Sequence, residues 1–274
     1  MADLHMHSTF SDGVYSFCEL VKKATTAGID TISITDHDCV AGGDEAAKCA
    51  ADFAIRVIPG IEFSANLNGR EIHLLGYFFD SSDPELLATI SYLREQRIVR
   101  AGRIVEKLNG LKIPVTMESV LKFAGAGSVG RPHIAHAVVD GGYAESYLQV
   151  FAKYIGDGCP AYEKKVEYTP QAVIKLVANA GRLSILAHPE KAISENDILS
   201  LIQAGIDRIE VIHPSHTPEL VRYYRAIVSQ YYLVESGGSD FHGGLRADDQ
   251  TVGRFYITRD SVEHMQRRLP RRFQ

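Results

Sequence analysis

Short apolar segments alternate with amphipathic helical segments over most of this 274-residue chain. This alternation is typical of βα units and predicts a largely parallel sheet covered by helices. Several of the apolar segments end in histidine or acidic residues. The carboxyl ends of parallel strands meet at one end of an α/β barrel, where barrel enzymes build their active sites. We therefore expect these polar residues to lie close together.

The predicted strands can be placed by their apolar runs, and Asn68-Gly69 predicts a hairpin turn between the third and the fourth. Strands are expected over residues 2–7, 31–35, 56–63, 71–79, 183–187, 208–212 and 232–236. From residue 85 to about residue 154 the pattern is continuously helical, with no convincing strand. This interruption predicts a barrel made of residues 1–79 and 169–274, with a helical insertion, or cap, at residues 80–168.

The overall composition excludes some classes of function. A hydrophobic content of 45% indicates a globular enzyme with a full-sized core. A net charge of −5 gives no general attraction to long duplex nucleic acid or to acidic membranes. No segment has the length of a spanning helix or the pattern of a secretory signal, so a cytoplasmic location is expected. The cysteines show no paired spacing and are expected to be reduced, packed thiols without a metal role: Cys18, Cys39, Cys49 and Cys159.

The first predicted strand carries a candidate metal-binding pair. His5 and His7 are two residues apart, so both imidazoles point to the same side of the strand. Asp12-Gly13 follows in a turn that could return a carboxylate to the same place. The alternative for this segment alone is a polar strand end with incidental histidines.

Other segments add further nitrogen and oxygen donors near strand ends. Buried imidazoles and carboxylates without partners would be costly, and metal ions would remove that cost. Donors of this kind without a thiolate suit Mn, Zn or Fe, and their number exceeds what one ion needs. Two or three divalent ions are therefore expected, an arrangement that serves hydrolysis of phosphate esters. The nine candidate ligands are His5, His7, Asp12, His37, Glu62, His73, His188, Asp240 and His242.

In chain order, the motifs "DLHMHSTFSDG", "TDHD", "GIEFS", "HLLGY", "AHP" and "GGSDFHG" resemble those of the polymerase-and-histidinol-phosphatase (PHP) family of metal-dependent phosphoesterases. The resemblance spans almost the whole chain. It implies a distorted (β/α)7 barrel that holds up to three metals, with the same nine residues as ligands and Glu62 as a bridge between ions. Asp12 stands where many members have a histidine. This departure resembles the subgroup of phosphatases of nucleoside monophosphates or 3′,5′-bisphosphates and of 5′-to-3′ exonucleases on short RNA.

Candidate substrate contacts lie outside the ligand segments. Arg131-Pro132-His133 begins a predicted helix after a glycine-rich stretch, and an arginine at a helix N-terminus makes an anion pocket. The alternative is an exposed arginine paired with an acid. His216 is predicted to contact the substrate or the leaving group, with a structural, hydrogen-bonded histidine as an equal alternative.

The roles of His213 and His136 are left open by the sequence. Lys164 and Lys165 are expected to be a solvated pair. Asp36 or Asp38 could orient the imidazole of His37, and a helix N-cap is the alternative for Asp38.

The expected reaction is attack of a metal-bridging hydroxide on the terminal phosphate of a nucleotide. Arg131 and His133 would neutralise the developing charge, and Asp12 or His216 would transfer a proton. The partner is a phosphorylated small molecule, either a nucleotide or a short oligonucleotide. The alternatives are a 5′-to-3′ exonuclease on short RNA or DNA, a histidinol phosphatase, and a non-catalytic metal-binding scaffold.

Overall fold

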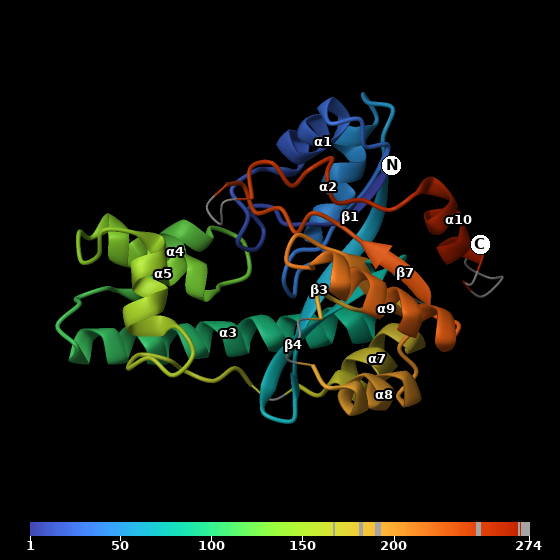
Figure 1. The fold of residues 1–274 in the computed structure, drawn as a ribbon. Helices are drawn as coiled ribbons and strands as arrows, with labels where there is room; N and C mark the ends of the chain where they lie inside the picture. The colour runs from blue at the N-terminus through green and yellow to red at the C-terminus, as the bar shows by residue number, and fades with distance from the viewer. Residues whose placement is uncertain (167, 181–182, 190–192, 245–247, 268, 270–274) are drawn as a thin grey trace.

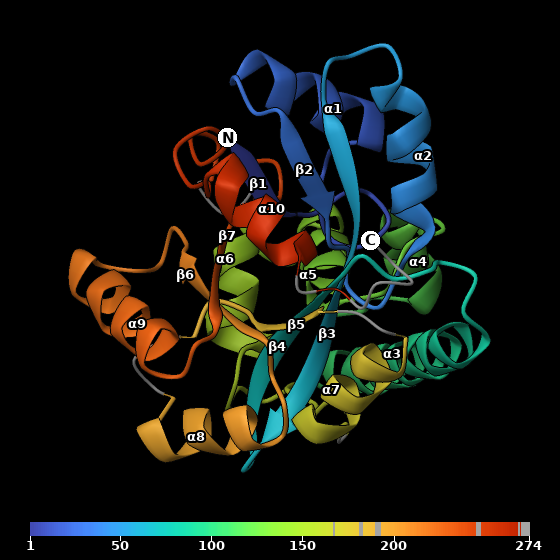
Figure 2. The same cartoon turned by 90° about the vertical axis from the view of Figure 1, so that its right-hand side faces the viewer.

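The computed structural model describes residues 1–166, 168–180, 183–189, 193–244, 248–267 and 269. At its centre lies a seven-stranded sheet whose strands follow one another in chain order. The last strand returns to the first, where the amide of His7 donates to the carbonyl of Phe241 at 2.9 Å. The sheet is thus nearly closed, which confirms the expected distorted α/β barrel (Figures 1 and 2). Its strands are β1 (Ala2–Met6), β2 (Thr31–Ile34), β3 (Arg56–Leu67), β4 (Arg70–Tyr77), β5 (Leu183–Leu186), β6 (Arg208–Ile212) and β7 (Val234–Gly237).

One strand of the barrel runs against all the others. β4 is antiparallel to both β3 and β5, whereas the remaining pairs are parallel. The turn before β4 has φ of 53° at Asn68 and 85° at Gly69, as a two-residue hairpin of this type requires. This confirms the predicted hairpin. Because β4 is reversed, its carboxyl end lies at the opposite end of the barrel from those of its neighbours.

Six helices of the described chain cover the outside of the barrel, as Figure 2 shows. Two of them begin with the same local signal, a threonine followed by proline. The Thr169 and Thr217 side chains accept hydrogen bonds from the first turn, and the proline that follows each has no amide to leave unsatisfied. The helices are α1 (Phe17–Thr26), α2 (Ala41–Ala50), α7 (Pro170–Asn179), α8 (Glu195–Gln203), α9 (Pro218–Gln230) and α10 (Arg259–Arg267).

The chain between β4 and α7 is helical, as the sequence predicts, and much of it lies to one side of the barrel (Figure 1). Its first helix, α3, is 27 residues long and is capped by Asp83, whose side chain accepts from the Leu86 amide. The other elements are α4 (Met117–Ala124), α5 (Arg131–Asp140), α6 (Tyr147–Val150) and a π-helix, η1 (Phe151–Ile155), while α3 itself spans Pro84–Gly110.

Helix α3 belongs to two hydrophobic cores. Leu86, Ile90 and Leu93 in its first half are buried in the barrel core against α7 and α9. Ile104 and Leu108 in its second half are buried in a separate core with α4, α5 and α6. The start of the insertion at residue 80 remains a prediction, since the helix that follows it is shared between barrel and cap.

The cysteines differ from the expectation of reduced thiols. Cys18 and Cys49 form a disulfide between α1 and α2, with their Cα atoms 5.4 Å apart. The 31-residue separation gave no sign of this pair, because only the packing of the two helices brings the residues together. Cys39 and Cys159 are free, as expected. In the part of the chain that the structure describes, no helix is both long and apolar enough to cross a membrane.

Candidate metal centre

The nine candidate ligands come from six strands or the residues that follow them, and the fold brings all nine together. β1 carries His5 and leads into His7, while β2, β5 and β7 end just before their histidines or aspartate. Glu62 and His73 lie within the paired strands β3 and β4. Ligand atoms of these residues form four groups in which all members lie within 4.8 Å: His5, Glu62 and His188; His5, His7 and Asp240; His7, His37 and Glu62; and His7, Asp12 and His242.

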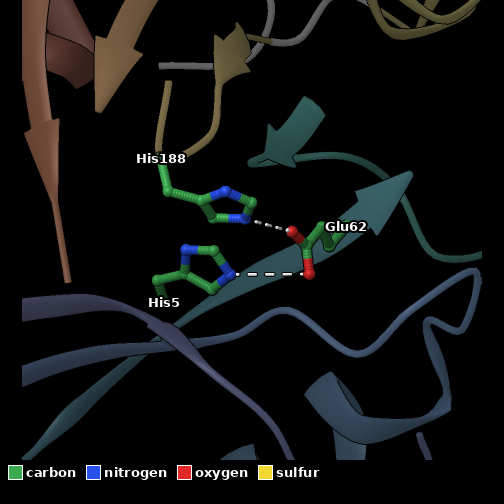
Figure 3. A group of neighbouring side chains, drawn as sticks. All are labelled: His5, Glu62 and His188. Carbon is green, nitrogen blue, oxygen red and sulfur yellow. Dashed lines mark hydrogen bonds and ion pairs between the residues drawn. The ribbon is translucent and has the colours of Figure 1, made fainter. Parts of the chain in front are cut away.

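Glu62 is the centre of this cluster and is almost fully buried. Its Oε1 lies 2.8 Å from His73 Nδ1 and 3.1 Å from His188 Nε2. Its Oε2 lies 3.2 Å from both His7 Nε2 and His37 Nδ1, and 3.5 Å from His5 Nε2. Figure 3 shows the carboxylate reaching between His5 and His188. Both oxygens of this carboxylate face histidines. Such a carboxylate could help to hold more than one ion.

Asp240 and Asp12 extend the cluster on either side of His7. Asp240 Oδ1 lies 3.2 Å from the Nε2 atoms of both His5 and His7. Asp12 Oδ1 lies 3.4 Å from His242 Nε2 and 3.7 Å from His7 Nδ1. Asp240 has φ of 47° and His188 has φ of 26°, values that cost energy in residues other than glycine. Two of the candidate ligands are therefore held in a strained backbone conformation.

The protonation of the cluster reflects its dense charge. Burial alone would lower the pKa of His7, but Asp240 and Glu62 raise it to about 10. Burial alone would raise the pKa of Glu62, yet the surrounding His37 and His73 hold it well below its usual range. Protons on His5, His7 and His73, whose pKa values are raised, would offset the buried carboxylates, and divalent cations could take over that role.

The ring nitrogens of the buried histidines show whether metal ions fit this site. Five buried imidazoles each have a nitrogen that faces a carboxylate oxygen at 3.2–3.4 Å without the geometry of a hydrogen bond: His5, His7, His37, His213 and His242. Buried polar atoms normally have a partner, and a neutral imidazole nitrogen is a good ligand for Zn, Mn or Fe. These nitrogens share one centre with three carboxylates. The residues present therefore fit divalent metal ions.

Two glutamates behind the cluster were not singled out from the sequence. Glu210 is fully buried in β6 and holds both His5, through Nδ1 at 3.0 Å, and the backbone amide of His188, at 2.7 Å. Glu71 Oε1 lies 3.0 Å from His73 Nε2, which leaves Nδ1 facing Glu62. A carboxylate bonded to the far nitrogen of a ligand histidine fixes the orientation of the ring. An acid amid the apolar run of β6, and an acid two residues before His73, were the signals available.

The two aspartates beside His37 make other contacts than those expected from the sequence. Asp36 accepts hydrogen bonds from the Ser8 amide and from the hydroxyls of Ser8 and Ser11, so it holds the loop between His7 and Asp12. Asp38 pairs with Arg97 from α3 at 2.5 Å. Among the described contacts, neither carboxylate bonds to the His37 ring, and α2 is preceded by Val40, without a side-chain cap. Their expected roles as an orienting group and as an N-cap are therefore wrong.

A cavity of about 460 Å³ opens between candidate ligands and the helices between β4 and α7. Its lining includes three kinds of side chain. They are candidate ligands, basic side chains of α3, α5 and the segment before α7, and side chains of α6 and η1. The cavity therefore offers cationic and apolar surface beside the cluster. The candidate ligands are Asp12, His37 and His73, which form the ligand edge of the cavity; the basic residues are Arg97, Arg100, Arg131 and Lys165; and those of α6 and η1 are Tyr147, Leu148 and Phe151.

Comparison with known proteins agrees with this geometry. The model of the PHP domain family matches residues 3–178. A 5′-3′ exoribonuclease of Haemophilus influenzae is 34% identical over 88% of this chain and 89% of its own length. A 3′,5′-nucleoside bisphosphate phosphatase of Chromobacterium violaceum is 30% identical over 88% of this chain and 86% of its own. The solved structure of a Bifidobacterium adolescentis protein assigned as a metal-dependent phosphoesterase superposes with a TM-score of 0.91 at 29% identity, covering 98% of this chain and 96% of that one.

The chain belongs to the PHP family. It is a metal-dependent phosphoesterase, as the resemblance of its motifs implied. In this PHP protein the candidate ligands lie near or after the carboxyl ends of parallel strands, except that Glu62 lies within β3 and His73 within the antiparallel β4.

The predicted substrate contacts of the PHP protein divide into two groups. Arg131 lines the cavity, although its guanidinium also pairs with Asp157 at 2.6 Å. His133 is buried, and its Nδ1 accepts from the Gly130 amide at the start of its own helix. It is absent from the described lining of the cavity, and its ring both caps its own helix and contacts the Ser11 backbone beside Asp12. Its burial lowers its pKa, which favours the neutral ring.

His216 has contacts typical of a structural histidine. Its Nδ1 lies 2.9 Å from the Val211 carbonyl and its Nε2 lies 3.0 Å from the Pro189 carbonyl, so both ring nitrogens face backbone oxygens. These contacts favour the alternative that the sequence left open. His213, in contrast, has Nε2 at 3.3 Å from Asp240 Oδ2 and therefore adjoins the cluster. The ring of His136 packs against that of Phe123, with the two ring centroids 5.6 Å apart.

Lys165 is the clearest departure from the sequence-based expectation of a solvated lysine pair. Its ammonium group is largely buried, donating to Ser64 Oγ at 2.7 Å and to Glu71 Oε1 at 2.6 Å. Burial, together with the nearby Arg97 and Arg100, lowers its pKa to about 8 despite the attraction of Glu71. The prediction failed because the pairing partner lies on β4, 94 residues earlier in the chain.

Proposed function

We propose that this PHP protein removes the terminal phosphate of a nucleotide, with two or three divalent ions held by the nine ligands. The observation that carries the proposal is the cavity itself, because it joins metal ligands, basic side chains and aromatic rings in one space. A phosphate group fits the ligand edge and the guanidinium of Arg131. A nucleoside fits the edge formed by Tyr147 and Phe151.

The side chains would divide the work as follows. When bound, the ions supply an activated water nucleophile and positive charge for the phosphoryl oxygens. Arg131 would orient the phosphate through paired N–H groups and offset the charge that develops on it. Among the three carboxylate ligands, Asp12 is the one that lines the cavity, so we assign proton transfer at the leaving oxygen to it. Glu210 and Glu71 would keep His5 and His73 in their ligand orientation.

A second candidate is 5′-to-3′ exonuclease activity on short RNA. Relatives from Haemophilus influenzae and Escherichia coli that carry this name are 34% and 32% identical to the chain. The chemistry at the phosphorus would be the same, and only the leaving group would differ. The intact set of ligands argues against a non-catalytic scaffold.

The test is a screen of purified, metal-loaded protein against a small set of phosphate esters. Adenosine monophosphates, adenosine 3′,5′-bisphosphate, histidinol phosphate and 5′-phosphorylated oligonucleotides of two to five residues would be compared by release of phosphate or of mononucleotides. Preferred release of phosphate from a nucleotide supports the proposal. Faster release of mononucleotides from the oligonucleotides would favour the exonuclease, and no activity on any compound with metals bound would favour the scaffold.

A further inference from the structure

The disulfide between Cys18 and Cys49 closes a loop of chain that contains a candidate metal ligand. Cys18 lies in the first turn of α1, shortly after Asp12, and Cys49 lies in the last turn of α2. Between the two cysteines the chain passes through β2 and His37. Figures 1 and 2 show α1 and α2 side by side. The cross-link thus joins the two helices that follow the Asp12 and His37 segments.

This disulfide lies where small molecules can reach it. Cys18 is exposed and Cys49 is partly exposed, whereas the free Cys39 is only 2% exposed. Thiol–disulfide exchange requires that a thiolate approach one of the two sulfur atoms. A disulfide between two surface helices meets this condition, and one buried in the core would not.

The described contacts hold α2 less firmly than α1. Helix α2 is preceded by Val40, which supplies no side-chain cap, and its sequence contains Gly42-Gly43, which lowers helix propensity. Its described buried side chains are those of Ala46 and Ala50, whereas α1 buries larger apolar side chains. An alanine removes little apolar surface from water. The disulfide therefore supplies a large part of what fixes α2 in place.

Helix α2 is joined to the metal ligands through a short segment. Residues 38–40 separate it from His37, whose Nδ1 lies 3.2 Å from Glu62 Oε2. Asp38 in this segment has φ of 48°, a conformation that costs energy outside glycine. Such a segment keeps its conformation only while its surroundings hold it. Arg97 of α3 holds Asp38 on one side, and α2 holds the segment at its other end.

We propose that the Cys18–Cys49 pair is a redox modification site, and that its reduction by a small-molecule thiol frees α2 and weakens the retention of metal at His37. The inference rests on His37 being a metal ligand, but not on which phosphate ester the protein hydrolyses. Oxidation of the pair restores the cross-link and the firm position of α2.

The chemistry is thiol–disulfide exchange with a thiol of the glutathione class. The thiolate of the small molecule attacks one cysteine sulfur and forms a mixed disulfide, and the other cysteine leaves as a thiolate that takes up a proton. A second small-molecule thiol attacks the mixed disulfide, which releases the remaining cysteine and the oxidised small-molecule disulfide. The protein gains two electrons and two protons, and the small-molecule disulfide can reverse both steps.

The experiment equilibrates the metal-loaded protein with mixtures of reduced and oxidised glutathione. Alkylation and mass spectrometry should show Cys18 and Cys49 changing together from a disulfide to two thiols, while Cys159 stays free. Reduction should lower Tm by about 5–10 °C, because it removes a constraint on the unfolded chain. Hydrogen exchange should rise more in α2 than in α1. Release of metal to a chelator should become about three- to tenfold faster.

The Cys18→Ser variant in the same mixtures is the matched control, because glutathione itself binds metal ions. Its metal release should equal that of the reduced wild-type protein at every ratio of thiol to disulfide. The Cys159→Ser variant removes a cysteine that is already free and should respond as the wild-type protein does.

Two results would overturn the proposal, and neither needs a variant. One is that Cys18 and Cys49 are alkylated as free thiols even after equilibration with oxidised glutathione alone. The other is that oxidised and reduced protein release metal equally fast. Protein that holds no metal in either state would contradict the proposed function as well, whereas hydrolysis of a nucleotide without any redox response would contradict this inference alone.

Discussion

Glu210→Gln should weaken metal binding although the residue contacts no substrate. In the wild-type protein, the two oxygens of Glu210 accept from two donors, His5 Nδ1 at 3.0 Å and the His188 amide at 2.7 Å. Glutamine has the same size but only one acceptor oxygen, so one donor would lose its partner. An unmade buried hydrogen bond costs about 1–3 kcal/mol, which corresponds to roughly 5- to 150-fold in an equilibrium constant. Metal affinity should fall by about that factor, because both donors belong to candidate ligands.

The assay combines elemental analysis with metal titration against a competing chelator, followed by steady-state kinetics at saturating metal. Glu235→Gln is the control, because Glu235 lies on the adjacent strand β7 and pairs with Arg225, whose side chain is 55% exposed. It should bind metal as the wild-type protein does. If folded Glu210→Gln protein matched the wild-type protein in metal affinity and turnover, the idea that this carboxylate orients the ligands would be refuted.

Three further outcomes are expected. Protein purified without chelator should contain at least two transition-metal equivalents per chain by elemental analysis, and active protein with one or none would contradict a multinuclear centre. The Arg131→Ala variant should keep its metal, and its kcat/KM should fall about ten- to hundredfold or more. The His188→Ala variant should lose metal as well as activity. Wild-type kinetics for Arg131→Ala would mean that the cavity is not the phosphate site. Because the Lys165 pKa of about 8 lies below its usual value, the group is charged below pH 8 and neutral above it, so kcat/KM should decline as pH rises through about 8. A pH profile of Lys165→Arg that declines at the same pH would show that another group is responsible.

The clustering of the nine candidate ligands could be predicted because their signal is local. Each of the nine lies in or just after a strand that its own apolar run identifies, and the parallel arrangement then brings the strand ends together. The hairpin was equally legible, since Asn68-Gly69 has the sequence that its turn requires. Arg131 could also be placed, because it follows a glycine-rich stretch and begins a helix.

The groups that surround the ligands depend on contacts between distant segments. Arg97 and Arg100 lie in a long helix whose sequence does not say which of its faces meets the barrel. Their burial depends on partners in other elements, such as Asp38 after β2 and the Glu163 carbonyl before α7. Two roles for His216 are equally consistent with the sequence, and only the positions of the Val211 and Pro189 carbonyls distinguish them. A charged residue in a helix or loop is usually solvated, so sequence patterns favour that state unless the fold is known.

The reversed strand β4 and the unbroken helix α3 together constrain how a substrate can reach the cavity. β4 ends beside the start of β5, where Tyr77 pairs with Leu183, and α3 carries the chain from there to the helices that follow it. Its 27 residues span about 40 Å. The helix is anchored at one end in the barrel core and at the other in the cap core, without a break between them. A helix without a kink curves only gently, so α3 should hold its two ends, and the cores in which they are buried, at a nearly fixed distance. A substrate should therefore enter the cavity without a slow movement of these helices.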